Sequence, residues 1–172
     1  SLRSVPTPLG KFAEHRGELL GLALFLMFLG AGARSTLLGG VDSTWDNGAA
    51  TGVWNTAANW SGDAIPDGTA TFNTTSVANC AIDVAVSITS IVIAAGYTGT
   101  LSHNSSFTVT TSGAFTIAAG TYTTNNEAVA VGSFSGGAAG TCNFGSTIIT
   151  CSGNFTRSST AINSGTSVIV FA

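Results

Sequence analysis

The chain is poor in charge, and the shortage is uneven along the sequence. Only 8% of the 172 residues are charged, against about 25% in a typical soluble domain. The stretch from Val41 to Thr156 contains six acidic residues and no lysine or arginine. Binding to nucleic acid needs clustered basic side chains that neutralise phosphates, so this composition excludes a nucleic-acid partner.

Histidines and clustered carboxylates, the usual sources of catalysis, are also scarce. His15 lies beside an apolar N-terminal stretch, and His103 lies in a Ser/Asn-rich turn where we expect it to be solvated. Enzymes that cut polysaccharides on β-helical folds need paired carboxylates or a basic residue in one groove. After residue 79 the chain offers only Asp83, Glu127 and Arg157, which are isolated in sequence. No Gly-x-Ser-x-Gly motif occurs either, so we predict no catalytic residues and no enzyme.

Recognisable metal-binding patterns are missing as well. Four aspartates precede residue 70, and their oxygens would suit Ca²⁺, but their spacing fits neither an EF-hand nor a nonapeptide calcium repeat. Aspartates in Gly-rich loops more often form Asx turns or cap strands. We expect these turn and cap roles, with a calcium site as the alternative, for Asp42, Asp46, Asp63 and Asp67. The sequence predicts no metal and no cofactor.

The three cysteines show no C-x-x-C spacing and no neighbouring histidine, which argues against zinc. They are Cys80, Cys142 and Cys151. An odd number leaves one thiol unpaired in an exported chain, and Cys142 could bridge to Cys151. However, Cys151 falls in the same inward strand phase as Val131 and Phe171, so we expect buried thiols.

What the chain does have is a repeat. Aliphatic residues recur at intervals of twenty residues: Val109, Val129, Ile149 and Ile169. In three of these four copies an apolar strand is followed by Gly and then Phe. Such a period is the length of one coil of a β-solenoid. A weaker copy aligns residues 91–98 with 115–122, so we expect the regular region to run from near residue 80 to the end.

The sequence therefore predicts an all-β fold, a parallel β-solenoid (β-helix) with coils of about 20 residues, preceded by an N-terminal apolar helix. A single coil cannot bury its own apolar side chains, whereas stacked coils merge them into one core. The four aliphatic residues should form one inward-facing column, and Phe115, Phe134 and Phe155 a second. The alternative is an antiparallel sandwich, which has similar strand spacing but does not require the same residues at a fixed interval.

The first forty residues have a different chemistry. Basic residues precede an uncharged, mostly apolar run from Leu19 to Ala33 that ends in Ala-Gly-Ala. This pattern is typical of a cleavable secretory signal peptide. Together with residues 34–38 it could also form a retained membrane or assembly helix, or a buried helix of a soluble domain. For an exported chain we expect the β region outside the cell, with membrane contact through residues 19–38 if the leader is retained.

A type IV pilin combines similar parts, since it has a basic leader, an apolar helix and a Ser/Thr-rich β domain. The stretch from His15 to Glu18 resembles the pilin processing site. That family carries Glu at the fifth position of the mature helix, whereas the fifth residue after Gly17 is Leu22. A pilin-like filament subunit packed through the N-terminal helix is therefore one of the alternative functions.

A segment between residues 44 and 72 holds all three tryptophans. It contains Trp45, Gly52-Val-Trp54, Asn59-Trp60, Pro66, Asp67 and Phe72. This pattern resembles the opening motif of large bacterial surface proteins of the autotransporter-associated β-strand type, in which such a motif precedes a parallel β-solenoid. The resemblance covers roughly residues 44–172, and it implies an exported, passive scaffold without catalytic residues.

The tryptophans have two interpretations. The first coil of a solenoid exposes an apolar cross-section and strand edges, and large indoles in an Asx/Gly-rich loop can cover them as a cap. The alternative is a carbohydrate-binding adhesin in which Trp45, Trp54 and Trp60 stack on sugars. The adhesin requires exposed indole faces.

Four Asn-x-Ser/Thr sequons predict glycosylation if the host modifies proteins in this compartment. They begin at Asn59, Asn73, Asn104 and Asn154.

The last strand copy, residues 167–171, is followed by Ala172 without the Gly and Phe of a complete coil. We expect this edge to be covered by a neighbour or by further chain. The expected organisation is a leader helix (1–40), a Trp-rich cap (41–79) and solenoid repeats (80–172). We predict an exported structural surface protein that serves as a filament, stalk or surface-array subunit, with homo-oligomer or filament neighbours as partners.

Overall fold

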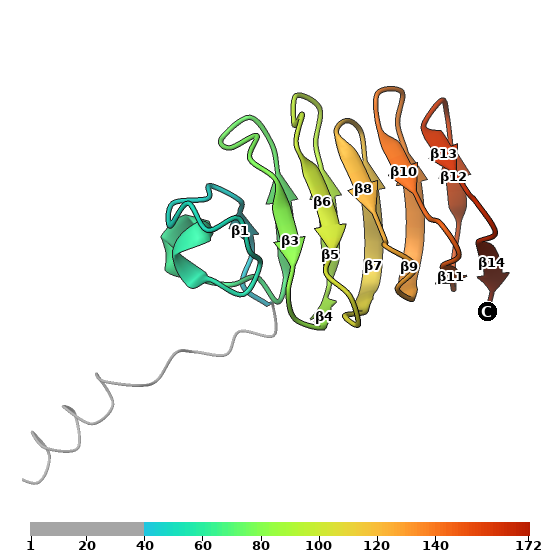
Figure 1. Cartoon of the computed structure of the whole chain (residues 1–172), viewed down its shortest axis with the longest axis horizontal. Coiled ribbons are helices and arrows are strands. Elements are labelled where there is room, and N and C mark those ends of the chain that lie inside the picture. Colours follow the sequence, from blue (N-terminus) through green and yellow to red (C-terminus); the bar gives the residue numbers. More distant parts are fainter. Residues whose placement is uncertain (1–39) are drawn as a thin grey trace, which may run out of the picture. The chain divides into compact units, whose positions relative to one another are not determined.

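The computed structural model describes residues 40–172, which wind through successive coils stacked along one axis (Figure 1). Every ladder between the strands of this part is parallel. The β-solenoid is therefore confirmed, and the antiparallel sandwich is excluded. The N-terminal helix, on which the pilin-like alternative also depends, lies outside the described residues. Within residues 40–172, no helix has the length and apolar character needed to cross a membrane.

The strands form a nine-stranded and a five-stranded parallel sheet. Because the first and second halves of β7 and β9 pair with different strands, the larger sheet divides into two rows, and the strands are described below as three stacks. Stack 1 contains the first parts of β7 (Val109–Ile117) and β9 (Val129–Gly136), with β4 (Val86–Ile88), β11 (Ile148–Cys151) and β14 (Val168–Phe171). Stack 2 contains the second parts of β7 and β9, with β1 (Ser43–Thr44), β2 (Thr69–Phe72), β5 (Ser90–Ile93) and β12 (Phe155–Arg157). Stack 3 contains β3 (Cys80–Ile82), β6 (Thr100–His103), β8 (Thr121–Thr123), β10 (Thr141–Asn143) and β13 (Ala161–Asn163). Two short 3₁₀ turns, η1 (Ala57–Asn59) and η2 (Ser61–Asp63), precede β2.

The Gly-x-Phe part of the repeat marks the corner between stacks 1 and 2. In β7 the register shifts between Thr111 and Ala114. A Cβ on Gly132 would lie 2.3 Å from the carbonyl oxygen of Ser112, and one on Gly153 would lie 2.6 Å from the oxygen of Gly132. Successive backbones therefore approach too closely at this corner for a side chain, which explains the glycines at positions 132 and 153.

The aliphatic column is present in stack 1. Its members lie opposite one another in consecutive coils: Val109, Val129, Ile149 and Ile169. The first three are buried, and Ile169 in the last coil is partly buried. The prediction that these four residues form one inward column is confirmed.

The aromatic column is present in stack 2. Phe134 stacks on Phe115 with ring centroids 6.0 Å apart, and on Phe155 with centroids 4.6 Å apart. The ring planes of these pairs are inclined by 19° and 13°. Each such pair contributes about 0.5–1.5 kcal/mol beyond the burial of its area. The second predicted column is confirmed as well.

Parallel stacking begins further upstream than residue 80. Ile91 lies opposite Phe115 and Ile93 opposite Ile117, as the weak sequence copy predicts. On its other side Ile91 lies opposite Ala70 in β2. The segment expected to act only as a cap therefore also supplies a strand to stack 2.

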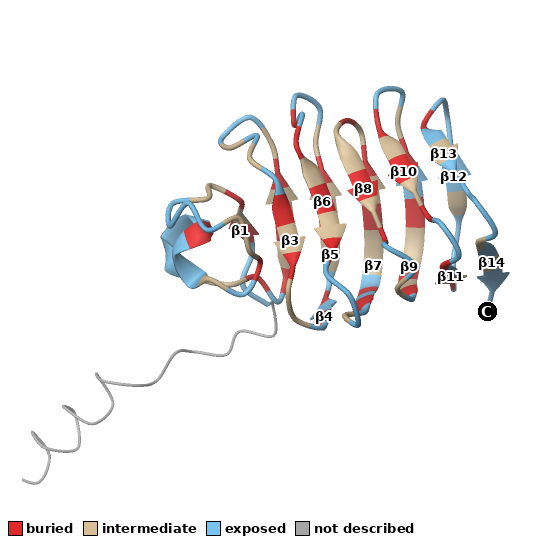
Figure 2. Cartoon of the chain, viewed as in Figure 1, coloured by how far each residue is buried: buried red, intermediate tan, exposed pale blue. Residues whose placement is uncertain are grey.

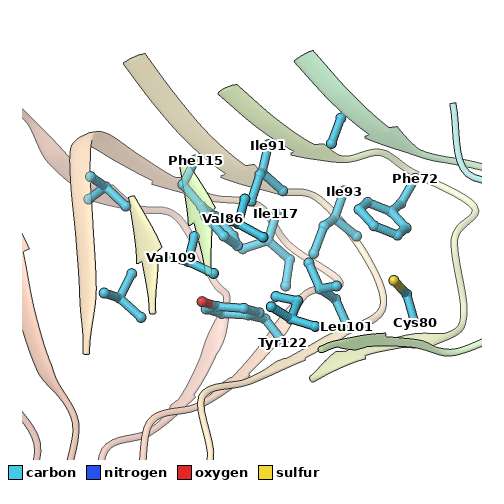
Figure 3. Packing of buried hydrophobic residues seen from close by; sticks show 14 of the residues in the cluster. Phe72, Cys80, Val86, Ile91, Ile93, Leu101, Val109, Phe115, Ile117 and Tyr122 are labelled. Atoms are coloured by element: carbon cyan, nitrogen blue, oxygen red, sulfur yellow. The ribbon is translucent and has the colours of Figure 1, made fainter. Parts of the chain in front are cut away.

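Inward and outward side chains alternate along each strand. In β8, for example, Tyr122 is buried while Thr121 and Thr123 are half-exposed. Residues from different stacks, such as Phe115 and Tyr122, point toward one another in the core (Figure 3). Buried residues follow the inner faces of the coils, whereas the last coil is mostly exposed (Figure 2). The outward residues are chiefly Thr, Ser and Asn.

Candidate functional site

The tryptophans form one aromatic cluster at the β1 end of the solenoid. Trp45, Trp54 and Trp60 are each at most 1% exposed. The Trp60 ring centroid lies 5.2 Å from that of Trp45 and 4.7 Å from that of Trp54, both in edge-to-face geometry. Phe72 of β2 joins the cluster, with its ring centroid 5.6 Å from that of Trp60. The cluster therefore continues the core of the coils into the loop that precedes them.

The polar edges of these aromatic rings bond to buried backbone. Trp60 Nε1 donates to the Trp54 carbonyl oxygen over 2.8 Å. Trp45 Nε1 (3.1 Å) and the Tyr97 hydroxyl (2.8 Å) both donate to the Ala78 carbonyl oxygen. Burial of Tyr97 raises the pKa of its hydroxyl above the usual range. Because buried indole and phenol groups need such partners, these contacts fix the position of the loop on the first coil.

Asn59 holds the cap loop together from the inside. Its side chain is fully buried, and Nδ2 donates to Thr51 Oγ1 over 2.7 Å and to the Val53 carbonyl oxygen over 2.9 Å. Its Oδ1 accepts from the Ala49 amide over 3.1 Å. The side-chain amide of Asn59 thus bonds to three groups across the loop. A buried polar side chain needs such partners, since an unpaired one would cost stability.

These contacts correct two expectations for the cap. Stacking on a sugar requires an exposed indole face, and all three indoles are buried. Their burial fits the cap and contradicts the carbohydrate-binding adhesin. Asn59 is fully buried and hydrogen-bonded, so its sequon is closed to modification in the folded chain. Among the remaining sequons, Asn104 and Asn154 are exposed and Asn73 is half-exposed.

His103 is a second buried polar residue, besides Asn59, and the expectation that it is solvated was wrong. It ends β6 and is fully buried. Nδ1 lies 2.8 Å from the Phe107 carbonyl oxygen, and Nε2 lies 2.6 Å from the Tyr122 hydroxyl. Because a carbonyl only accepts, Nδ1 carries the proton, and the neutral ring accepts from Tyr122 at Nε2.

The electrostatics favour this neutral imidazole. Burial lowers the pKa of His103 below its ordinary value, against the opposing effects of the Phe107 carbonyl and the Glu127 carboxylate. Burial also raises the pKa of the Tyr122 hydroxyl. The pair links β6 to β8 inside the core without exposing either group to a ligand.

The turns between stacks 3 and 1 are linked by further polar contacts between coils. Asn126 Oδ1 accepts from the Ser146 amide, and Glu127 Oε1 accepts from the Ser106 amide, each over 2.8 Å. Thr124 Oγ1 donates to the Phe144 carbonyl oxygen over 2.9 Å. These contacts tie neighbouring coils together, and no motif in the sequence marks the residues that make them.

The cysteines are buried and unpaired, as the sequence indicated. Cys142 and Cys151 lie on different stacks, on β10 and β11, so the alternative bridge between them is absent. Burial raises the pKa of the Cys142 thiol to about 12 and that of Cys80 further still. These thiols therefore act as small apolar core residues.

The aspartates mostly bond to backbone amides. Asp46 Oδ1 accepts from the Gly48 amide over 2.9 Å, which is an Asx turn. Asp42 Oδ1 accepts from the Thr69 amide over 2.6 Å, and Asp67 Oδ1 accepts from the Val41 amide. Residues 40–172 contain no group of three or more acidic, His or Cys side chains arranged to hold a metal ion. Asp63 lies in η2 with a positive φ of 51°.

The charged residues considered for catalysis are distributed over separate places. Asp83 follows β3 and accepts from the Asn55 amide over 2.8 Å. Glu127 precedes β9 and is bonded to Ser106, whereas Arg157 ends β12 in the last coil. The structure therefore brings together no pair of the three.

Comparison with protein-family models, curated proteins and solved structures finds no match to this chain.

Proposed function

We propose that the chain is an exported structural protein whose β-solenoid acts as a passive scaffold. The observation that supports this proposal most strongly is the uninterrupted stack of coils. It has one inward core, and its outward faces consist mainly of uncharged Thr, Ser and Asn. Backbone ladders connect each described coil to the next, and the aliphatic and Phe columns connect the coils from β7 onward. Such an array suits a mechanical role because each repeat is held directly by its neighbours.

The polar groups of the interior support this proposal. His103, Asn59 and Thr124 are fully buried, and each is bonded within the chain. They therefore link segments of the fold, and none of them is positioned to meet a substrate. The surface between Val41 and Thr156 also offers no lysine or arginine, the residues at which many extracellular proteases cut.

Export is proposed from the sequence. The basic residues, the apolar run and the Ala-Gly-Ala ending of the first 33 residues have the features of a secretory leader. The Trp-rich motif resembles that of autotransporter-associated β-strand proteins, which are surface scaffolds. In this proposal the protein is a filament, stalk or surface-array subunit at the cell surface. Its partners are further copies of itself, and also the membrane if residues 19–38 are retained.

Mass analysis of the N-terminus of the native protein, combined with cell fractionation, tests export. Cleavage after Ala33 gives a protein that begins at Arg34 and is released or surface-bound. Retention of the leader with recovery in the membrane fraction gives an anchored protein. An uncleaved chain found only in the cytoplasm would refute the proposal.

A further inference from the structure

One corner of the solenoid contains a residue that can change its charge near neutral pH. At this corner stack 3 ends and the chain turns towards stack 1, and the inward side chains of consecutive coils follow one another in parallel register. In four successive coils they are Ile82, His103, Thr124 and Phe144, all of them buried. Of these four residue types, histidine alone takes up a proton between pH 5 and 8.

The turn from β6 to β7, residues 104–108, depends on the neutral form of the His103 ring. Nδ1 donates to the Phe107 carbonyl oxygen over 2.8 Å and so holds the turn from the inside. Nε2 accepts from the Tyr122 hydroxyl over 2.6 Å. A proton on Nε2 would occupy the lone pair that accepts this bond, and it would leave a charge and an unsatisfied hydroxyl in the core.

The groups around the ring give a charged imidazole little support. Glu127, in the turn before β9, favours the charged form, but its effect is smaller than that of burial. The other titratable side chains on β3, β8 and β10, and directly after β3, are Cys80, Tyr122, Cys142 and Asp83. Burial raises the pKa of the first three, which are therefore neutral. The Asp83 carboxylate accepts from the Asn55 amide at an exposed position.

The turn itself is lightly held. Four of its five residues are exposed and Phe107 is half-buried. Ser106 has a φ of 74°, a left-handed conformation that costs energy in a residue with a side chain. The Asn104 amide donates to the Ile82 carbonyl oxygen, and the Ser106 amide donates to Glu127 Oε1, each over 2.8 Å. Exposed segments with few contacts open locally while the surrounding structure stays folded.

Opening of this turn is coupled to pH. In an opened turn the ring of His103 lies in water, where its pKa is about 6.5, whereas burial lowers its pKa in the closed turn. Below pH about 6.5 the open form therefore takes up a proton that the closed form resists. The ratio of open to closed molecules rises as the pH falls, by at most about tenfold per pH unit, until the pH reaches the pKa of the closed form.

We propose that the turn of residues 104–108 is an acid-sensitive switch, which closes over the neutral His103 ring and opens when Nε2 takes up a proton from the solvent. Opening separates the end of β6 from Tyr122, while the ladders of stacks 1 and 2 continue to hold the coil. This inference goes beyond the scaffold role proposed above, because it assigns to one coil a response to its surroundings.

Hydrogen exchange of the full chain, followed by mass spectrometry at pH 7 and pH 5, tests the switch. The rates are corrected for the effect of pH on intrinsic exchange, and peptides covering 101–108 and 141–148 are compared. The second peptide is the matched control, because Phe144 takes the place of His103 there and the Ser146 amide is bonded to Asn126 Oδ1 over 2.8 Å. We expect protection of 101–108 to fall about tenfold and that of 141–148 to stay constant. Constant protection of 101–108, or an equal fall in both peptides, would overturn the proposal.

The same measurement on His103→Gln assigns the effect to the ring. A glutamine side chain can donate to the Phe107 carbonyl and accept from Tyr122, but it does not titrate. We expect the fall in protection of 101–108 to disappear. A fall that persists would refute the role of His103. If this variant does not fold, the two wild-type peptides still decide the question. Neither measurement depends on export, so failure here leaves the N-terminal mass experiment to decide the scaffold proposal separately.

Discussion

The first and the last of the described coils differ in how far their apolar side chains are buried. At the β1 end, large aromatic side chains are packed edge to face under a loop, and Trp60 is fully buried. At the β14 end, Phe171 is 67% exposed and its strand has one neighbour, β11. In a stacked repeat each coil is stabilised by its contacts with adjacent coils. Within the described residues, an aromatic side chain packed between coils therefore contributes more to stability than one in the last coil.

The largest expected difference is between Trp60→Ala and Phe171→Ala. Removal of the buried indole leaves a cavity and breaks the bond to the Trp54 carbonyl, so we expect a loss near the upper end of the usual 3–5 kcal/mol in unfolding free energy. Phe171→Ala should change it by less than about 0.5 kcal/mol. Urea unfolding at low protein concentration measures both. Similar losses for the two variants would contradict the contrast between the ends.

A smaller difference is expected within the aromatic column. Phe134 is sandwiched between Phe115 and Phe155 and is 3% exposed, whereas Phe155 has a ring on one side and is half-buried. We expect Phe134→Ala to cost about 3–4 kcal/mol and Phe155→Ala about half of that or less. Urea unfolding of the two variants, each compared with Phe→Leu at the same site, separates lost stacking from lost volume. Equal losses would mean that the last coil is covered.

A third comparison uses asparagines at the two ends. Asn59→Ala removes the buried donor to the Val53 carbonyl oxygen and to Thr51 Oγ1, and we expect a loss of about 1–3 kcal/mol. Asn163 is exposed in the last coil and donates to Asn143 Oδ1 over 2.6 Å, so Asn163→Ala should cost less than about 0.5 kcal/mol. Thermal unfolding of both variants under identical conditions is the measurement. A greater loss from Asn163→Ala would contradict the assignment of Asn59 as the structural residue.

The interior coils were predictable because their residues obey two simple regularities. The interval of twenty residues placed Val109, Val129 and Ile149 in register, and the Gly-x-Phe element placed Phe134 on Phe115. Further upstream the interval changes, since Ile91 pairs with Phe115 over 24 residues. The repeat is harder to recognise there because the corners of these coils differ in length. The interval between equivalent residues then changes, although their strands still pair.

The polar centres were harder to foresee, although one local signal existed. His103 follows Leu101 by two residues, so the alternation of a strand places both side chains inward; the Ser/Asn-rich text after His103 suggested a turn instead. Asn59 begins a sequon, which suggested an exposed side chain. Its burial follows from a loop that folds back around its amide, and no sequence pattern indicates that loop. Such contacts depend on which segments the fold brings together.

The smallest effect on the unfolding free energy is expected from acidification, and it acts through His103 in the interior coils. Because burial lowers the pKa of His103, the unfolded chain takes up a proton below pH about 6.5 that the folded chain resists. Folding stability should therefore fall as the pH decreases from 7 to 5, by at most about 1.4 kcal/mol per pH unit from this residue. The measurement is the unfolding free energy of wild type and His103→Gln at both pH values, since subtraction cancels the contribution of the carboxylates. Equal pH dependence in the two proteins would show that the imidazole is not held neutral between β6 and β8.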